Sequence, residues 1–192
     1  MLIILLYQSY GGNNADPYVQ AIEKKREQKN HQFATAPNSP ISEKERKTTF
    51  KGLSYFPVEP QFQTQAVLSE SSGTDTLRLE TTKGASSKYY RAGVLTFSLL
   101  GQNYKLTAYR NSAQNLTNLF VPFKDLSSGV SSYPGGRYLD VEVKNMQEIT
   151  LDFNEAYNPY CVYNAEYSCP VPPAENRLNI EILAGERKWE GK

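Results

Sequence analysis

The sequence has few of the side chains on which metal sites and nucleophilic active sites usually depend. Its 192 residues include two cysteines, Cys161 and Cys169, and one histidine, His31. These three side chains are too few and too dispersed for a four-ligand zinc site. A Ser-His-Asp or Cys-His arrangement would have to use His31, which lies in a charged, helix-like stretch. We therefore expect no metal site and no cofactor.

The chain also lacks a strong net charge and long apolar runs. Its formal net charge is +1, so the composition gives no reason to expect nucleic acid or an anionic membrane as a partner. No segment contains the roughly 20 apolar residues that a membrane-spanning helix requires, so we expect no transmembrane span.

The chain begins with a short apolar run, which is followed by residues with small side chains. The run Leu2–Leu6 precedes Ser9 and Gly11, an arrangement that resembles the end of a signal peptide with its cleavage site. We interpret residues 1–12 as the remnant of a signal peptide, which predicts a periplasmic or secreted protein. The alternative is a short buried strand at the N-terminus.

Residues 13–52 have the pattern of a helical arm. Asp16 and Pro17 make a favourable helix start, with the aspartate as N-cap and the proline in the first turn. Ser42 and Glu45 have the spacing of a capping box, which predicts a second short helix over about 43–50. The lysines and arginine of residues 24–29 alternate with glutamates, which is more typical of a solvated helix face than of a binding patch.

From residue 53 to residue 192 the apolar residues alternate with polar ones, as in half-buried strands. Such segments lie near 62–68, 77–79, 94–99, 104–109, 138–143, 149–154 and 178–182. Gly101-Gln102-Asn103 is typical of a hairpin turn. The apolar run 119–123 contains Pro122, which favours an edge strand or a loop. We expect a mainly β fold, an antiparallel sandwich or partly open barrel, with the N-terminal helical arm attached.

A connection of about twenty residues without periodicity separates the last two predicted strands, whereas most connections have about two to six residues. It is rich in tyrosine, proline and cysteine. Its sequence includes Asp-Phe-Asn-x-Ala-Tyr-Asn-Pro-x-Cys from residue 152 and Cys-Pro-x-Pro-Pro-x-Glu-Asn-Arg-Leu from residue 169. Together with the upstream segments 120–125 and 136–140, this resembles the signature of a bacterial and archaeal domain of unknown function, number 1684. The resemblance covers about 40–187 and implies a family without an assigned activity.

Polar residues at both ends of this connection form the candidate site. Asp152 and Asn154 share the polar face of one predicted strand, and Glu175 and Arg177 stand next to the other. If the two strands are neighbours, these side chains converge at one rim. The residues that we expect to bind a ligand there are Asp152, Asn154, Tyr157, Glu175, Asn176, Arg177 and Arg137.

The residue types leave several functions open for this rim. The side chains could be structural ties, or they could bind a small polar or anionic ligand in an extracytoplasmic domain. Asp152 and Glu175 could alternatively act as the acid and base of a hydrolase. An envelope interaction protein without a pocket is a further alternative. A concave, partly buried cleft at the rim would favour a ligand site or an enzyme.

The two cysteines have seven residues between them. This spacing predicts a loop-closing disulfide between Cys161 and Cys169 in an oxidising compartment. A redox pair is less favoured by the pattern, because the Cys-x-x-Cys spacing is absent.

Overall fold

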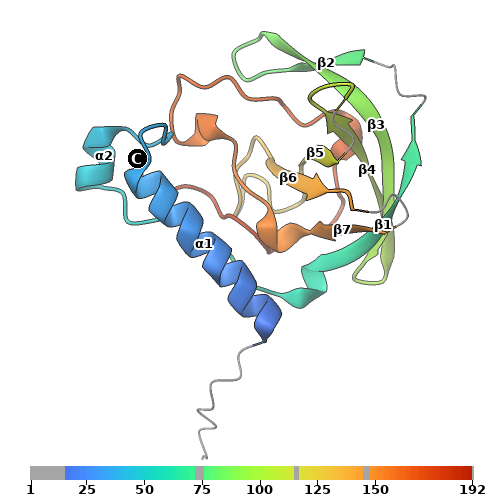
Figure 1. The fold of residues 1–192 in the computed structure, drawn as a ribbon, viewed down its shortest axis with the longest axis horizontal. Coiled ribbons are helices and arrows are strands. Elements are labelled where there is room, and N and C mark those ends of the chain that lie inside the picture. The colour runs from blue at the N-terminus through green and yellow to red at the C-terminus, as the bar shows by residue number, and fades with distance from the viewer. Residues whose placement is uncertain (1–15, 72–75, 115–116, 145–147, 192) are drawn as a thin grey trace, which may run out of the picture.

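The structure, a computed structural model, describes residues 16–71, 76–114, 117–144 and 148–191 (Figure 1). The predicted remnant of a signal peptide, residues 1–12, lies outside these residues. Among the helices of the described residues, none has the length and apolar character that crossing a membrane would require.

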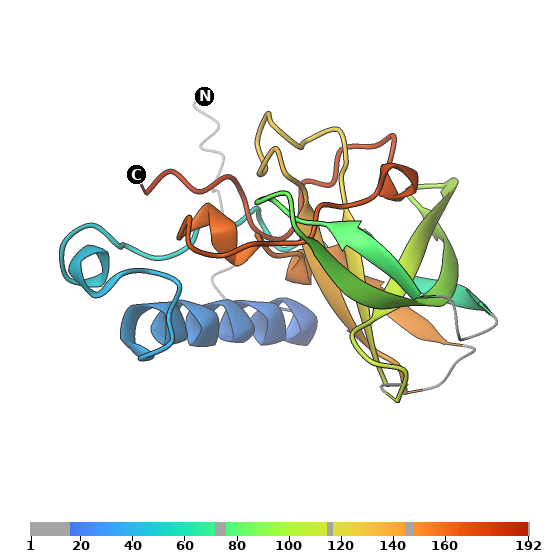
Figure 2. The same ribbon diagram turned by 90° about the horizontal axis from the view of Figure 1, so that it is seen from above.

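The N-terminal arm forms the two predicted helices. Helix α1 (Pro17–Thr35) begins at Asp16, whose carboxylate accepts a hydrogen bond of 2.9 Å from the backbone N–H of Tyr18. Helix α2 (Glu43–Thr48) begins at Ser42 with the complete capping box to Glu45. Figure 2 shows both helices to one side of the strands. The two predicted helices are therefore confirmed, with α2 ending two residues earlier than expected. The predicted solvated face of residues 24–29 is wrong for two of its side chains: Arg26 is buried and donates to Phe56 O at 2.9 Å, and Lys29 pairs with the buried Glu186.

Seven strands form one antiparallel sheet, in the order β6-β5-β4-β3-β1-β7, with β2 paired to β3. The strands β6 and β7 at the two ends of this order approach each other, so the sheet nearly closes into a barrel (Figure 1). The predicted fold class is confirmed. The strands are β1 (Gln63–Glu70), β2 (Thr76–Glu80), β3 (Ser86–Leu99), β4 (Gln102–Arg110), β5 (Asn118–Phe123), β6 (Arg137–Glu142) and β7 (Ile149–Asp152).

The hairpin between β3 and β4 forms one residue earlier than expected. Leu99 pairs with Gln102, so the turn consists of Leu100 and Gly101. Both turn residues have positive φ, 49° and 79°. This backbone matches a type I′ turn, whose twist fits two antiparallel strands.

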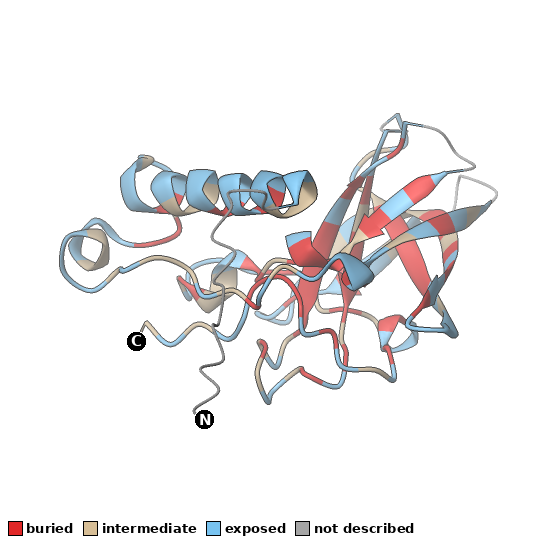
Figure 3. Cartoon of the chain, turned by 90° about the horizontal axis from the view of Figure 1, so that it is seen from below, coloured by how far each residue is buried: buried red, intermediate tan, exposed pale blue. Residues whose placement is uncertain are grey.

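Alternation along the strands builds the core. Figure 3 shows buried and exposed positions alternating along the strands. The inward side chains include Leu95, Leu106, Val121 and Ile149, all with no exposed surface. Burying an aliphatic side chain of this size contributes about 1.5–3 kcal/mol. The positions of the apolar residues along each strand therefore determine which residues face inward and which face outward.

The last predicted strand, 178–182, is not a strand. Leu178 and Ile182 are buried, as the alternation predicted, but the segment is irregular. It hydrogen-bonds with the residues that follow β5: the Leu178 N–H donates to Lys124 O, and the Leu126 N–H donates to Ile180 O. These scattered bonds do not continue a strand ladder, so burial of its side chains, rather than sheet pairing, fixes the segment.

The strand β5 lies between β4 and β6, so the expectation of an edge strand or loop at Pro122 is wrong. The proline is accommodated inside the sheet because β4 and β5 pair only at Tyr109 and Phe120 and separate before they reach Pro122. The gap is filled by Asn176, whose side chain accepts from the Thr107 N–H at 2.7 Å. Its amide nitrogen donates to the carbonyl oxygens of Thr107 (2.8 Å) and Pro122 (2.7 Å). Pro122 pairs with Tyr138 of β6 on one side, and on the side that faces β4 it meets the Asn176 side chain. Its missing N–H therefore interrupts no ladder bond with β4.

We predict that Asn176→Ala lowers the free energy of unfolding by about 3 kcal/mol or more, because three buried backbone groups lose a partner. The substitution leaves buried backbone groups of Thr107 and Pro122 without partners, and each such group costs about 1–3 kcal/mol. Denaturant unfolding measures the effect. The matched control is Asn179→Ala at a nearby exposed position, where a change within about 0.5 kcal/mol is expected. Equal unfolding of the two variants would contradict the assigned role.

Candidate ligand-binding groove

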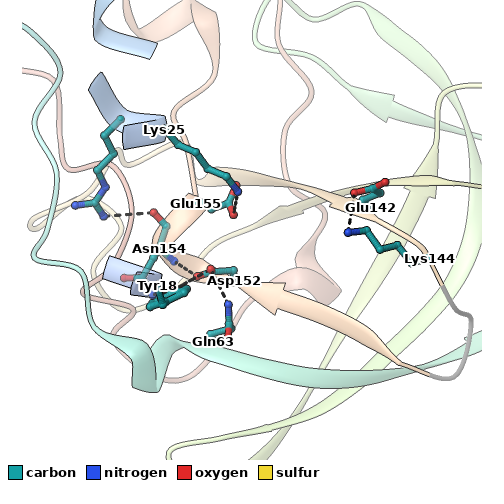
Figure 4. A network of polar contacts seen from close by, with 9 residues as sticks. Tyr18, Lys25, Gln63, Glu142, Lys144, Asp152, Asn154 and Glu155 are labelled. Atoms are coloured by element: carbon teal, nitrogen blue, oxygen red, sulfur yellow. Dashed lines mark hydrogen bonds and ion pairs between the residues drawn. The ribbon is translucent and has the colours of Figure 1, made fainter. Parts of the chain in front are cut away.

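Asp152 and Asn154 tie helix α1 to the end of β7 (Figure 4). The Tyr18 hydroxyl lies 2.9 and 2.8 Å from the two carboxylate oxygens of Asp152. Asn154 is buried, and its side chain accepts from the Glu59 N–H at 2.9 Å and donates to Glu59 O at 2.8 Å. Its amide also donates to the Tyr18 hydroxyl at 2.9 Å. These contacts are those of a structural tie.

The residues at the other end of the connection contact different strands. The Glu175 carboxylate lies 3.4 Å from the Tyr109 hydroxyl on β4, next to Asn176 with its bonds to β4 and β5. Arg177 is exposed. Among the described residues no hydrogen bond or ion pair joins Asp152 to Glu175 or to Arg177. The structure therefore does not bring the two predicted carboxylates together through any direct contact.

Arg137 is fully buried and its guanidinium is occupied by protein groups. It forms an ion pair of 2.8 Å with Asp125 and donates to the carbonyl oxygens of Ile182, Ala184 and Glu186. Burial lowers the pKa of Arg137, and the neighbouring Asp125 carboxylate opposes this shift. This arrangement holds the C-terminal segment against β6.

Tyr157, the remaining predicted residue, lines a groove of about 530 Å³. We call it the aromatic groove, because six aromatic side chains form much of its wall. A second hollow of about 410 Å³ shares Tyr89, Phe120 and Asp140 with it and so extends it. The aromatic residues are Tyr89, Phe120, Tyr138, Tyr157, Tyr160 and Tyr167, and the polar ones are Lys29, Asp140, Glu155 and Ser168.

The floor of the aromatic groove is the outer face of β5 and β6. On β6, Leu139 and Val141 enter the core, so Tyr138 and Asp140 face outward. On β5, Phe120 lies directly opposite Asp140. The Tyr89 ring on β3 stacks on Phe120 with 5.4 Å between the centroids. The strand alternation thus places aromatic rings and one carboxylate side by side.

The connection after β7 supplies the opposite wall. Tyr157 and Tyr138 exchange backbone hydrogen bonds of 3.0 and 2.9 Å, which fixes the connection to β6. The Tyr157 hydroxyl donates to Asp140 at 2.8 Å. Burial, together with the Asp140 charge, raises the pKa of Tyr157. The hydroxyl therefore stays protonated and keeps the Asp140 carboxylate in place.

The charges of the aromatic groove are unevenly compensated. Lys29 forms an ion pair of 2.7 Å with the buried Glu186 and lies 4.7 Å from the centre of the Tyr157 ring. Glu155 pairs with Lys25. Asp140 is exposed, and no basic side chain among the described residues pairs with it. One carboxylate of the aromatic groove is thus available to a positively polarised group.

The comparisons with known proteins support the resemblance seen in the sequence. A family model described as a protein of unknown function, DUF1684, matches residues 48–187. The chain belongs to the DUF1684 family. The matched range contains every residue named for the aromatic groove except Lys29.

A solved relative shares both sequence and fold with this DUF1684 chain. The solution NMR structure of an uncharacterized protein from Haloarcula marismortui is 37% identical and has a TM-score of 0.70. The match covers 88% of this chain and 94% of the archaeal chain. No curated protein matches.

Sequence reasoning found the connection but missed most of the aromatic groove. Tyr89, Phe120 and Tyr138 are not among the side chains predicted for the site. The sequence does contain a signal for the groove. Phe120 and Tyr138 are aromatic residues at positions where the alternation of the strands predicts polar side chains that face outward.

We predict that the free energy of unfolding falls as the pH rises above about 10, the ordinary tyrosine pKa. Burial raises the pKa of Tyr138, Tyr157 and Tyr163, so the folded protein keeps protons that the unfolded chain loses. Stability is then fully present below about pH 10 and is lost by up to about 1.4 kcal/mol per pH unit for each such group. Urea unfolding at pH 9, 10 and 11 measures the slope. Tyr138→Phe should reduce it, and an unchanged slope would contradict the assignment.

Proposed function

We propose that this protein is a binding module that holds a small polar organic molecule in the aromatic groove. The observation that carries the proposal is the exposed carboxylate of Asp140, which has no basic partner among the described residues and lies among six aromatic side chains. Binding sites for small molecules commonly combine apolar walls with a few oriented polar groups.

The chemistry of the groove favours a ligand with a flat or aliphatic face and at least one hydrogen-bond donor. Aromatic rings such as Phe120 and Tyr138 can pack against the face, and Asp140 can accept from a hydroxyl or an ammonium group. An ammonium group would also interact favourably with the ring faces. An anionic ligand is disfavoured, because Asp140 would repel it and Lys29 is already paired with Glu186.

We further propose that the protein works outside the cytoplasm. The proposal rests on the apolar run Leu2–Leu6 with the small residues that follow it. Cell fractionation of the native host should recover the protein outside the cytoplasm. Recovery in the cytoplasmic fraction would contradict the proposed location and leave the proposed groove untouched.

The binding proposal predicts that Asp140→Asn weakens a donor-bearing ligand by roughly 10–100-fold in Kd. This range corresponds to the about 1.5–3 kcal/mol of a hydrogen bond to a charged group. Thermal shift with choline, glucose and glutamate as probes, followed by calorimetry on any that bind, makes the measurement. We expect choline or glucose to stabilise the protein and glutamate to have no effect.

The matched control is Glu142→Gln, which removes a carboxylate from the same face of β6 two residues further along. Glu142 is exposed and pairs with Lys144, outside the aromatic groove. Glu142→Gln should bind the probe like the wild type. Equal affinity for wild type and Asp140→Asn, or stabilisation by glutamate alone, would overturn the proposal.

A further inference from the structure

The two cysteines are further apart in sequence than in a Cys-x-x-Cys motif, yet they are in contact within the 157–170 connection. Cys161 lies in the 3₁₀ turn Tyr160–Val162 and is partly exposed, whereas Cys169 is buried. The Cys161 N–H donates to the Cys169 sulfur at 3.2 Å. Both are free thiols in this structure, so the disulfide predicted from the sequence stays a prediction.

Side chains from three separate segments lower the pKa of Cys161. They belong to Cys169, to Thr82 after β2, and to Tyr133 in the connection between β5 and β6. The hydrogen bond from Cys169 is the largest cause that lowers the pKa of Cys161, which falls to about 6. The contact with Cys161, followed by burial, raises the pKa of Cys169. The negative charge of the pair is therefore favoured on Cys161.

We propose that Cys161 and Cys169 form a reactive dithiol site, in which Cys161 attacks a small-molecule disulfide and Cys169 resolves the product. The proposal is independent of the ligand in the aromatic groove. It rests on the contact between the two residues, on the donors around Cys161 and on the difference in exposure between the sulfurs.

The chemistry proceeds by two exchange steps. The Cys161 thiolate attacks one sulfur of the disulfide RSSR, forms a Cys161–SR mixed disulfide and releases RS⁻. Cys169 then loses its proton, attacks the Cys161 sulfur and releases the second RS⁻. The protein is oxidised by two electrons, and RSSR is reduced to two RSH once the released thiolates take up protons.

The surrounding backbone is held in place for the second step. The Thr82 N–H donates to Cys169 O at 2.9 Å, and the Val171 N–H donates to Glu80 O at 2.8 Å. The 3₁₀ turn that carries Cys161 is closed by the Tyr163 N–H bond to Tyr160 O. Both cysteines therefore sit on anchored backbone, and the Cys161 N–H already contacts the Cys169 sulfur.

Selective alkylation of the reduced full-length protein tests the first half of the proposal. With limiting iodoacetamide at pH 7, we expect Cys161 to be modified at least tenfold faster than Cys169, as read by peptide mass spectrometry. The titratable groups that face the pair, Tyr89, Tyr133 and Tyr138, have raised pKa values and stay neutral at this pH. Equal alkylation rates of Cys161 and Cys169 in the folded protein would overturn the proposal. The same measurement in urea, where the two rates should be equal, is the unfolded reference.

Oxidised glutathione tests the second half. Wild type should release two molecules of glutathione and end as the internal disulfide, whereas Cys169→Ser should trap one glutathione on Cys161. Cys161→Ser should react at least tenfold more slowly than Cys169→Ser. A wild-type protein that ends as a stable mixed disulfide, or two single variants that react alike, would refute the assigned roles.

A third test concerns the Tyr133 hydroxyl and keeps both cysteines, so it remains informative if a cysteine variant misfolds. Tyr133→Phe should slow the alkylation of Cys161 at pH 7 and raise its midpoint pH. Tyr104→Phe, on β4 and beside Gln102, should alkylate like the wild type. No difference between these two variants would remove the hydrogen-bond argument.

Discussion

The buried ion pair between Arg137 and Asp125 is the interaction on which the arrangement around the aromatic groove depends. Both side chains are almost fully buried, and their charged atoms lie 2.8 Å apart. The guanidinium also lies over the rings of Phe56 and Phe123, 5.8 and 5.5 Å from their centres. Breaking a buried pair by removing one partner typically costs about 3–5 kcal/mol, because the remaining charge is left uncompensated. The pair therefore holds its neighbours in one geometry.

The consequences of this pair reach the aromatic groove through Glu186. By binding the carbonyls of Ile182, Ala184 and Glu186, Arg137 helps to fix a segment that otherwise has only an isolated bridge, between Glu186 and Tyr55, among the described residues. Glu186 at its end accepts from the Asn158 N–H and the Tyr163 hydroxyl, both at 2.7 Å, and pairs with Lys29 of α1. One buried carboxylate thus joins the helical arm to the connection, and both of these contribute walls to the aromatic groove.

The sequence predicted what depends on local pattern and missed what depends on contacts between distant segments. The caps at Asp16 and Ser42, the alternation of the strands and the long connection are local signals, and each appears in the fold. The strand predicted at 178–182 is absent because an alternating pattern indicates which side chains are buried, and an irregular segment can bury Leu178 and Ile182 as well as a strand can. The convergence of Asp152 with Glu175 was inferred from that missing strand. The role of Asn176 depends on a gap between β4 and β5, which no spacing along the chain reveals.

The aromatic groove can remain open because its walls do not depend on a ligand to stay in place. Tyr138 hydrogen-bonds to Pro170 O, Tyr157 is fixed to β6, and Tyr160 and Tyr167 contact each other edge to face at 5.3 Å. Such a surface has little conformational freedom to lose on binding, so more of the contact energy becomes affinity. The same rigidity places Cys169 on the wall of the groove, in contact with the more exposed Cys161. A change in the oxidation state of the pair would therefore act on the wall that carries Tyr160 and Tyr167, next to the site where a ligand would bind.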